Sequence, residues 1–191
     1  MGREFELKYR ANPVVLEELR AEFGPYDTIT METAYYDAAD HALSQRRWTL
    51  RRRLENGVSV CTVKTPAHGG ARCEWEVIWD DLEAAIPRLV QLGAPEELTQ
   101  YTASGIVQTC AARFTRLAAT LTLENGTVEL ALDQGVLIGG GKELPFAEVE
   151  VELKEGPEEA AIAFAQELAR RYGLTPEPRS KVQRALALAN P

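Results

Sequence analysis

Cysteine and histidine are scarce in this chain of 191 residues, which has three cysteines and two histidines. The cysteines, Cys61, Cys73 and Cys110, are odd in number and have no C-x-x-C spacing, so we expect buried, reduced thiols. The chain also lacks a signal or transit peptide and any hydrophobic run near the ~20 residues of a membrane span. These absences predict a cytoplasmic protein with no membrane partner.

Positive charge is in the minority, because 21 Lys and Arg against 29 Asp and Glu give a net charge of −8. This balance disfavours nucleic acid or an anionic membrane as a partner. Basic residues are nonetheless clustered at Arg46, Arg47, Arg51, Arg52 and Arg53, which allows a locally basic site inside an acidic protein. A hydrophobic content of 45%, without linkers or repeats, predicts one globular domain over residues 1–191.

Alternating patterns and turn signals predict an α+β protein. Asn56-Gly57 and Asn125-Gly126 each indicate a tight hairpin, and Asn12-Pro13 indicates the start of a helix. The expected strands cover residues 3–10, 28–36, 48–54, 58–65, 72–79, 110–123, 127–137 and 143–154. The expected helices cover 13–23, 80–92, 157–172 and 180–189, with an irregular helical stretch at 95–108. Eight strands in antiparallel hairpins predict a closed eight-stranded β-barrel with helices packed outside.

The first strand alternates charge and hydrophobe, so Glu4, Glu6 and Lys8 lie on one face and the hydrophobic side chains on the other. The same alternation returns at residues 148–154, where carboxylates and aliphatic residues again take opposite faces. The charged faces point either to solvent or into the barrel. The abundance of arginines and carboxylates favours the interior, as do Leu-, Ile- and Phe-rich helices that need apolar strand faces to pack on.

An inward charged face predicts a particular ligand chemistry. Buried charges without partners are costly, so such an interior would hold water, ions and ligand. Glutamate clusters suit hard cations such as Mg²⁺ or Mn²⁺, and arginine forks suit phosphoryl oxygens. Together they indicate a site for a metal-chelated polyphosphate and for phosphoryl transfer.

The ordered motifs of the chain resemble those of the CYTH superfamily, the triphosphate tunnel metalloenzymes. The set comprises the E-x-E-x-K of Glu4, Glu6 and Lys8, then Tyr35-Tyr36-Asp37, the L-R-x-R of residues 50–53, Lys64, Glu74-x-Glu76, Arg116, Glu150-x-Glu152 and Ser180-Lys181. The segment at 128–135 is most similar to the bacterial inorganic triphosphatases. The resemblance covers nearly the whole chain and implies a closed eight-stranded tunnel with inward charges.

The resemblance also implies roles for these residues in metal-dependent hydrolysis of inorganic triphosphate to diphosphate and phosphate. Catalytic roles are implied for Glu4, Glu6 and Lys8. Divalent metal, Mg²⁺ or Mn²⁺, would be bound by Glu4, Glu6, Glu150 and Glu152, with Glu76 and Asp133 as further ligands or as partners of basic groups. The triphosphate would be bound by Lys8, Arg51, Arg53, Lys64, Arg116 and Lys181.

Other activities of the same tunnel stay open at this stage. They are an adenylate cyclase of the class IV type, a thiamine or nucleoside triphosphatase, and a non-catalytic polyphosphate-binding module. An organic substrate needs a clamp, but Trp48 has the parity of Leu50 rather than Arg51, so we expect it to pack under an outer helix. A monomer and a homodimer are both compatible with the sequence.

Overall fold

The computed structural model describes residues 2–67 and 72–189, with side chains from Phe5 onward. Its strands are β1 (Gly2–Glu4), β2 (Glu6–Arg10), β3 (Asp27–Ala38), β4 (Thr49–Glu55), β5 (Val58–Pro66), β6 (Arg72–Ile78), β7 (Ile106–Leu123), β8 (Gly126–Gly139), β9 (Lys142–Glu155) and β10 (Thr175–Pro176). Its helices are α1 (Pro13–Glu22), the 3₁₀ helix η1 (Ser44–Arg46), α2 (Leu82–Gln91), α3 (Glu97–Tyr101), α4 (Glu158–Tyr172) and α5 (Lys181–Ala189). None of the helices in this described part has the length and hydrophobicity that a bilayer crossing requires.

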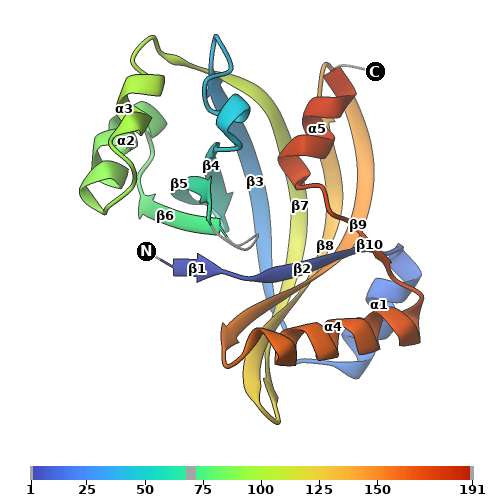
Figure 1. Ribbon diagram of the computed structural model, residues 1–191. Helices are drawn as coiled ribbons and strands as arrows, with labels where there is room; N and C mark the ends of the chain where they lie inside the picture. Colours follow the sequence, from blue (N-terminus) through green and yellow to red (C-terminus); the bar gives the residue numbers. More distant parts are fainter. Residues whose placement is uncertain (1, 68–71, 190–191) are drawn as a thin grey trace.

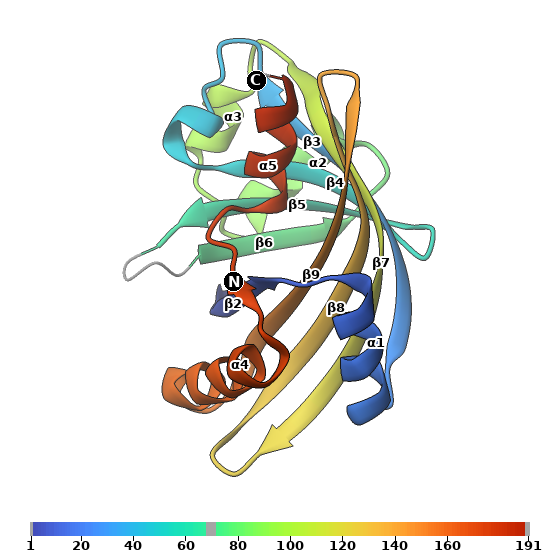
Figure 2. The same cartoon turned by 90° about the vertical axis from the view of Figure 1, so that its right-hand side faces the viewer.

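The described strands form one antiparallel sheet in the order β1-β6-β5-β4-β3-β7-β8-β9-β2-β10, which confirms the predicted α+β class. The sheet curls strongly, as Figures 1 and 2 show. The predicted strand at 3–10 is interrupted at Phe5, so β1 pairs with β6 and β2 pairs with β9. One N-terminal segment therefore lies near both ends of the strand order, and the ladder is a curled open sheet of ten strands rather than a closed ring of eight.

Two hydrophobic cores lie on the outer face of the sheet (Figure 1). α1 and α4 cover β2, β8 and β9, where Ala161, Ala165 and Leu168 of α4 pack on Val149 and Val151. α2 and α3 cover β4, β5 and β6 at the other end of the sheet. These helices lie outside as predicted, because the aliphatic side chains of the strands beneath them point outward.

Trp48 belongs to the second outer core, where its ring meets that of Tyr101 in α3 edge to face at 5.5 Å. It packs under an outer helix, as its parity predicts. The stretch expected to be helical at 95–108 is shorter, since α3 ends at Tyr101 and β7 begins at Ile106. β3 extends to Ala38, which pairs with Ile106 and so recruits these residues into the sheet.

α5 differs from the other helices because it packs against the inner face of the sheet. Its residues Val182, Ala185 and Leu186 belong to a third hydrophobic core together with Phe114 of β7 and Tyr35 of β3. Phe114 and Tyr35 also line a cavity inside the curled sheet. The inward parity of β7 is apolar at this end, with Cys110, Ala112 and Phe114, and so it provides a hydrophobic seat for the helix. The prediction of helices outside therefore does not extend to α5.

Candidate functional site

The curled sheet encloses a cavity of about 350 Å³ whose lining is dominated by charge. Of the residues that the structure describes, seven acidic and eight basic side chains line it. The acidic ones are Glu6, Glu55, Glu74, Glu76, Glu129, Glu150 and Glu152, and the basic ones are Lys8, Arg51, Arg53, Lys64, Arg72, Arg116, Lys154 and Lys181. The charged parity of the strands thus faces inward, as the interior alternative and the family resemblance both predict.

The predicted site residues gather at this cavity with two exceptions. Asp133 is fully buried and lies behind the lining, where it contacts Arg116 and Lys181. The side chain of Glu4 lies outside the described part of the structure, so the role predicted for it stays a prediction. All the others, from Glu6 to Lys181, line the cavity.

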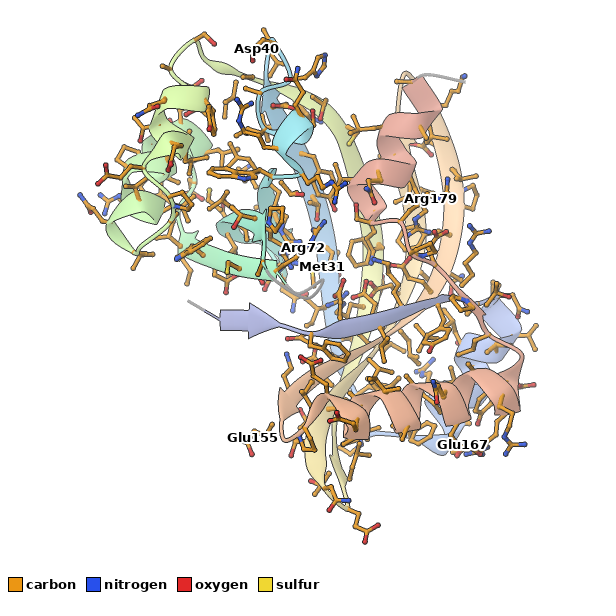
Figure 3. The ribbon with its side chains drawn as sticks, viewed as in Figure 1. Met31, Asp40, Arg72, Glu155, Glu167 and Arg179 are labelled. Atoms are coloured by element: carbon orange, nitrogen blue, oxygen red, sulfur yellow. The ribbon has the colours of Figure 1, made fainter. Side chains whose placement is uncertain are left out.

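The charged lining divides into two walls. We call Arg51, Arg53, Lys64 and Arg72, on β4, β5 and β6, the basic wall, and Glu6, Glu129, Glu150 and Glu152, on β2, β8 and β9, the acidic wall. Between them β3 contributes the uncharged side chains Ile29, Met31, Thr33 and Tyr35. In Figure 3 Met31 and Arg72 lie close to the middle of the molecule, whereas Asp40, Glu155 and Glu167 lie at its periphery.

A single carboxylate holds two cations of the basic wall. Glu74 Oε1 accepts from Arg51 Nη2 at 3.2 Å, and its Oε2 lies 3.2 Å from Lys64 Nζ. Burial alone would raise the pKa of Glu74, but Lys64 and Arg51 outweigh it and lower the pKa. Glu74 therefore stays ionised and fixes both cations in the cavity.

The basic wall also carries unsatisfied donors. Burial, together with the like charge of Arg51, lowers the pKa of Arg53 to about 10, although Glu55 is in contact. The Nε atoms of Arg51 and Arg53 are buried and have no hydrogen-bond partner among the residues that the structure describes. Buried donors without partners are costly, and an oxyanion is the group that guanidinium donors engage most strongly. This wall is therefore suited to an anion.

Behind the acidic wall, three carboxylates share two cations that reach the cavity. Lys181 Nζ lies 2.8 Å from Asp133 Oδ2 and 2.8 Å from Glu150 Oε1, and it also contacts Glu148. Arg116 donates to both oxygens of Asp133, each at 2.8 Å, and to Glu150. Burial would raise the pKa of Glu150, but Lys181 and Arg116 hold it well below its usual value. Both cations are therefore held by several carboxylate oxygens, those of ionised Glu150 among them.

Oxygens of Asp133, Glu148 and Glu150 lie within 4.8 Å of one another, a spacing that could hold a metal ion. Their oxygens, however, already accept from Lys181 and Arg116, so a divalent cation placed there would compete with two fixed charges. The acidic residues that open to the cavity suit a metal better.

Those open carboxylates form a row across three strands. Glu6 pairs in register with Glu152, which pairs in register with Glu129, and neighbouring strands are only about 4.8 Å apart. Their side chains are 34%, 26% and 25% exposed and line the cavity. Lys154 Nζ lies 2.9 Å from Glu152 and 3.6 Å from Glu129. Carboxylate oxygens that are partly exposed to solvent are suitable ligands for Mg²⁺ or Mn²⁺.

Sequence reasoning missed several residues of the site: Glu74, Glu129, Glu148, Lys154 and Arg184. The first four share the inward parity of residues that were identified, so their strand positions carried the signal. Arg184 follows Lys181 by three residues on α5, a spacing that places both on one helix face. That Arg184 pairs with Glu148 of β9, however, had no local signal in the sequence.

This architecture, a curled antiparallel sheet around a cavity of interleaved carboxylates and cations, defines a protein class that holds small, highly charged ligands. The CYTH domain family model matches residues 2–186, so the chain belongs to the CYTH domain family. Among curated proteins, it is 27% identical over 197 residues to an inorganic triphosphatase of Haemophilus influenzae. The match covers all of this chain and 56% of the length of that relative.

Solved structures share the fold at low sequence identity. A candidate adenylate cyclase from Bacillus halodurans is 20% identical, with a TM-score of 0.65 over 96% of this chain and 98% of its own. A candidate adenylyl cyclase from Hippeastrum, described with a dominant triphosphatase activity, is 15% identical and has a TM-score of 0.68. The match covers 97% of this chain and 96% of the Hippeastrum chain. A protein from Pyrococcus horikoshii is 23% identical, with a TM-score of 0.66 over 97% and 99%.

Proposed function

We propose that this protein is a metal-dependent triphosphatase that hydrolyses inorganic triphosphate to diphosphate and phosphate in the charged cavity. The observation that carries the proposal is the basic wall, which lies across the cavity from a row of carboxylates and whose buried guanidinium Nε donors have no partner in the described part of the chain. The name of the Haemophilus relative supports it. Because the chain spans 56% of that relative, activity, substrate and partners are all proposed here.

The cations of the cavity would bind the substrate. Arg51, Arg53 and Lys64 would hold one side of a linear chain of phosphoryl groups from the basic wall. Lys8, Arg116 and Lys181 would meet it from the opposite side, and the last two are already oriented by their contacts with Asp133 and Glu150. Positioning of this kind needs no covalent nucleophile, because phosphoryl transfer is catalysed chiefly by placement and charge neutralisation.

The open row of Glu6, Glu129 and Glu152 would hold Mg²⁺ or Mn²⁺, with Glu4 as a further predicted ligand. A divalent ion bound there supplies charge neutralisation at the phosphoryl oxygens. Lys8 lies 3.7 Å from Glu6 and pairs in register with Glu150, so its ammonium can contact substrate beside the row. Glu150 and Asp133 would serve mainly by orienting Arg116 and Lys181, and Glu76 would balance the basic wall.

Phosphate release from inorganic triphosphate, measured beside ATP and thiamine triphosphate with Mg²⁺, Mn²⁺ or EDTA, tests the proposal. We expect fast, metal-dependent release from inorganic triphosphate and little from the two organic substrates. A preference for ATP would instead support a nucleotide activity, and the product, ADP or cyclic AMP, would identify it. Tight binding of triphosphate without release would support a binding module.

A further inference from the structure

A buried ion pair lies next to the cavity without lining it. Glu148 on β9 is fully buried, Arg184 on α5 is 7% exposed, and the guanidinium contacts Glu148 Oε2. Neither side chain belongs to the cavity lining. A charge pair sequestered from both solvent and ligand pays a desolvation cost that apolar side chains would avoid, so its role calls for a physical explanation.

Glu148 divides its two oxygens between two cations of the same helix. Oε1 accepts from Lys181 and Oε2 accepts from Arg184, one helical turn further along α5. The ring of Phe146 lies under both, 5.5 Å from Lys181 Nζ and 5.4 Å from the Arg184 guanidinium carbon. Arg184 thus engages the oxygen of Glu148 that Lys181 does not use.

The surrounding cluster is balanced in charge. The carboxylates of Asp133, Glu148 and Glu150 face three cations that contact them, Arg116, Lys181 and Arg184. Arg116 and Lys181 reach the cavity, whereas Arg184 does not. Without Arg184, the two cavity cations would have to neutralise three carboxylates between them, and less of their charge would act on a ligand.

We propose that Arg184 is a positioning residue that neutralises Glu148 and so leaves the ammonium of Lys181 able to bind a polyphosphate anion. The inference rests on the proposed function, since it concerns how the same cavity binds triphosphate. It makes opposite predictions for the two partners of one ion pair. Removing the cation of Arg184 should weaken triphosphate binding, and removing the charge of Glu148 should strengthen it.

Calorimetric titration with inorganic triphosphate in EDTA tests this inference without turnover. We expect about tenfold weaker binding for Arg184→Met and about tenfold tighter binding for Glu148→Gln, the scale of one unit charge several ångströms from the ligand at an effective protein dielectric. The double variant restores the balance of charge and should bind within about threefold of the wild type. Arg184→Lys keeps the charge and should also bind nearly as the wild type does.

Arg113 and Glu143 provide a matched control. Arg113 Nη2 lies 2.7 Å from Glu143 Oε1, and this exposed ion pair is not part of the cavity lining. Arg113→Met and Glu143→Gln should leave the affinity unchanged. If Arg184→Met and Glu148→Gln shift the affinity in the same direction, the pair is merely structural and the inference is overturned. If Arg184→Met does not fold, weak binding by Arg184→Lys overturns it equally. Failure of the wild type to bind triphosphate would overturn the proposed function, and the inference with it.

Discussion

The two walls of the cavity hold their charges in different ways. Behind the acidic wall, Lys181 and Arg116 each contact more than one carboxylate at hydrogen-bonding distance. On the basic wall, Arg51 and Lys64 share the carboxylate of Glu74, and the Nε of Arg51 has no hydrogen-bond partner within residues 2–67 and 72–189 as the structure describes them. Lys181 and Arg116 are thus engaged by carboxylates of the protein, whereas the described residues leave the Nε donors of Arg51 and Arg53 available to a ligand.

This difference teaches that charge balance and hydrogen-bond satisfaction are separate properties of a site. The acidic wall resembles a preassembled scaffold, whose geometry is present before any ligand arrives. The basic wall bears the cost of buried donors, which binding of an anion would relieve. Stability and function should therefore respond in opposite ways to mutations of the basic wall.

The largest expected effect comes from the open row of the acidic wall. Glu6→Gln removes a carboxylate proposed to bind the metal, and we expect metal-dependent phosphate release to fall by more than about a hundredfold, beyond the 10–100-fold typical of losses outside the ligand shell. Release kinetics across a Mg²⁺ titration measure this effect, with circular dichroism to verify folding. Glu143→Gln is the matched surface control. Unchanged turnover in Glu6→Gln would refute the metal-ligand role.

Arg53→Met tests the basic wall. We expect triphosphate affinity to fall by about tenfold to a hundredfold, the range for a hydrogen bond to a charged group. We expect no decrease in melting temperature, because the variant removes a buried guanidinium whose pKa burial has already lowered to about 10. Titration calorimetry and thermal unfolding measure the two quantities, with Arg113→Met as control. If Arg53→Met lowers both the melting temperature and the triphosphate affinity, the interactions of Arg53 within the protein are stabilising, and the proposed difference between the two walls is wrong.

A smaller effect concerns the anchor that leads the chain into α5. Glu177 is buried and accepts from Arg10 Nε at 2.6 Å and from the backbone nitrogen of Arg179 at 3.1 Å. Burial alone would raise its pKa, but these hydrogen bonds lower it to about 2 from an ordinary value of 4.5. The resulting stabilisation is present above pH 4.5 and is lost as the pH falls towards 2.

Glu177→Gln should therefore flatten part of the acid dependence of stability. Between pH 7 and pH 3 we expect the wild type to lose about 1 to 2 kcal/mol more than the variant, at 1.36 kcal/mol per pKa unit and with half-exposed arginines as partners. Urea unfolding at both pH values measures the difference. Parallel losses in the two proteins would show that Glu177 does not anchor the segment.

Strand faces were the part of the fold that the sequence predicted best. Alternation placed Glu150 and Glu152 on one face and Val149 and Val151 on the other, because a side-chain period of two leaves only two choices, and the family resemblance turned the charged face inward. Asn-Gly pairs marked the β4–β5 and β7–β8 hairpins, and Asn56 and Gly57 indeed have positive φ at the first of these turns. Local chemistry determined these features, so local reading was sufficient.

Features set by distant partners could not be read in the same way. An apolar helix face does not reveal whether it packs outside or inside a curled sheet, and α5 found its seat on Phe114 and Tyr35. The ion pair of Glu148 with Arg184 joins elements 36 residues apart, and neither partner indicates the other. The break at Phe5 likewise depends on distant strands, because the residues before it pair with β6 and the residues after it pair with β9.

The pairing of β2 with β9 has a consequence for folding of the protein during its synthesis. Glu6 is synthesised before Glu129 and Glu152. The row of carboxylates is therefore complete only when these later residues have been synthesised and have folded beside Glu6. Such distant pairing slows folding, and β2 must wait with an unpaired edge. Its alternating charges, Glu6 and Lys8, discourage that edge from joining other chains. Glu6 and Lys8, proposed to bind metal and substrate in the folded protein, would therefore also make aggregation of the nascent chain less favourable.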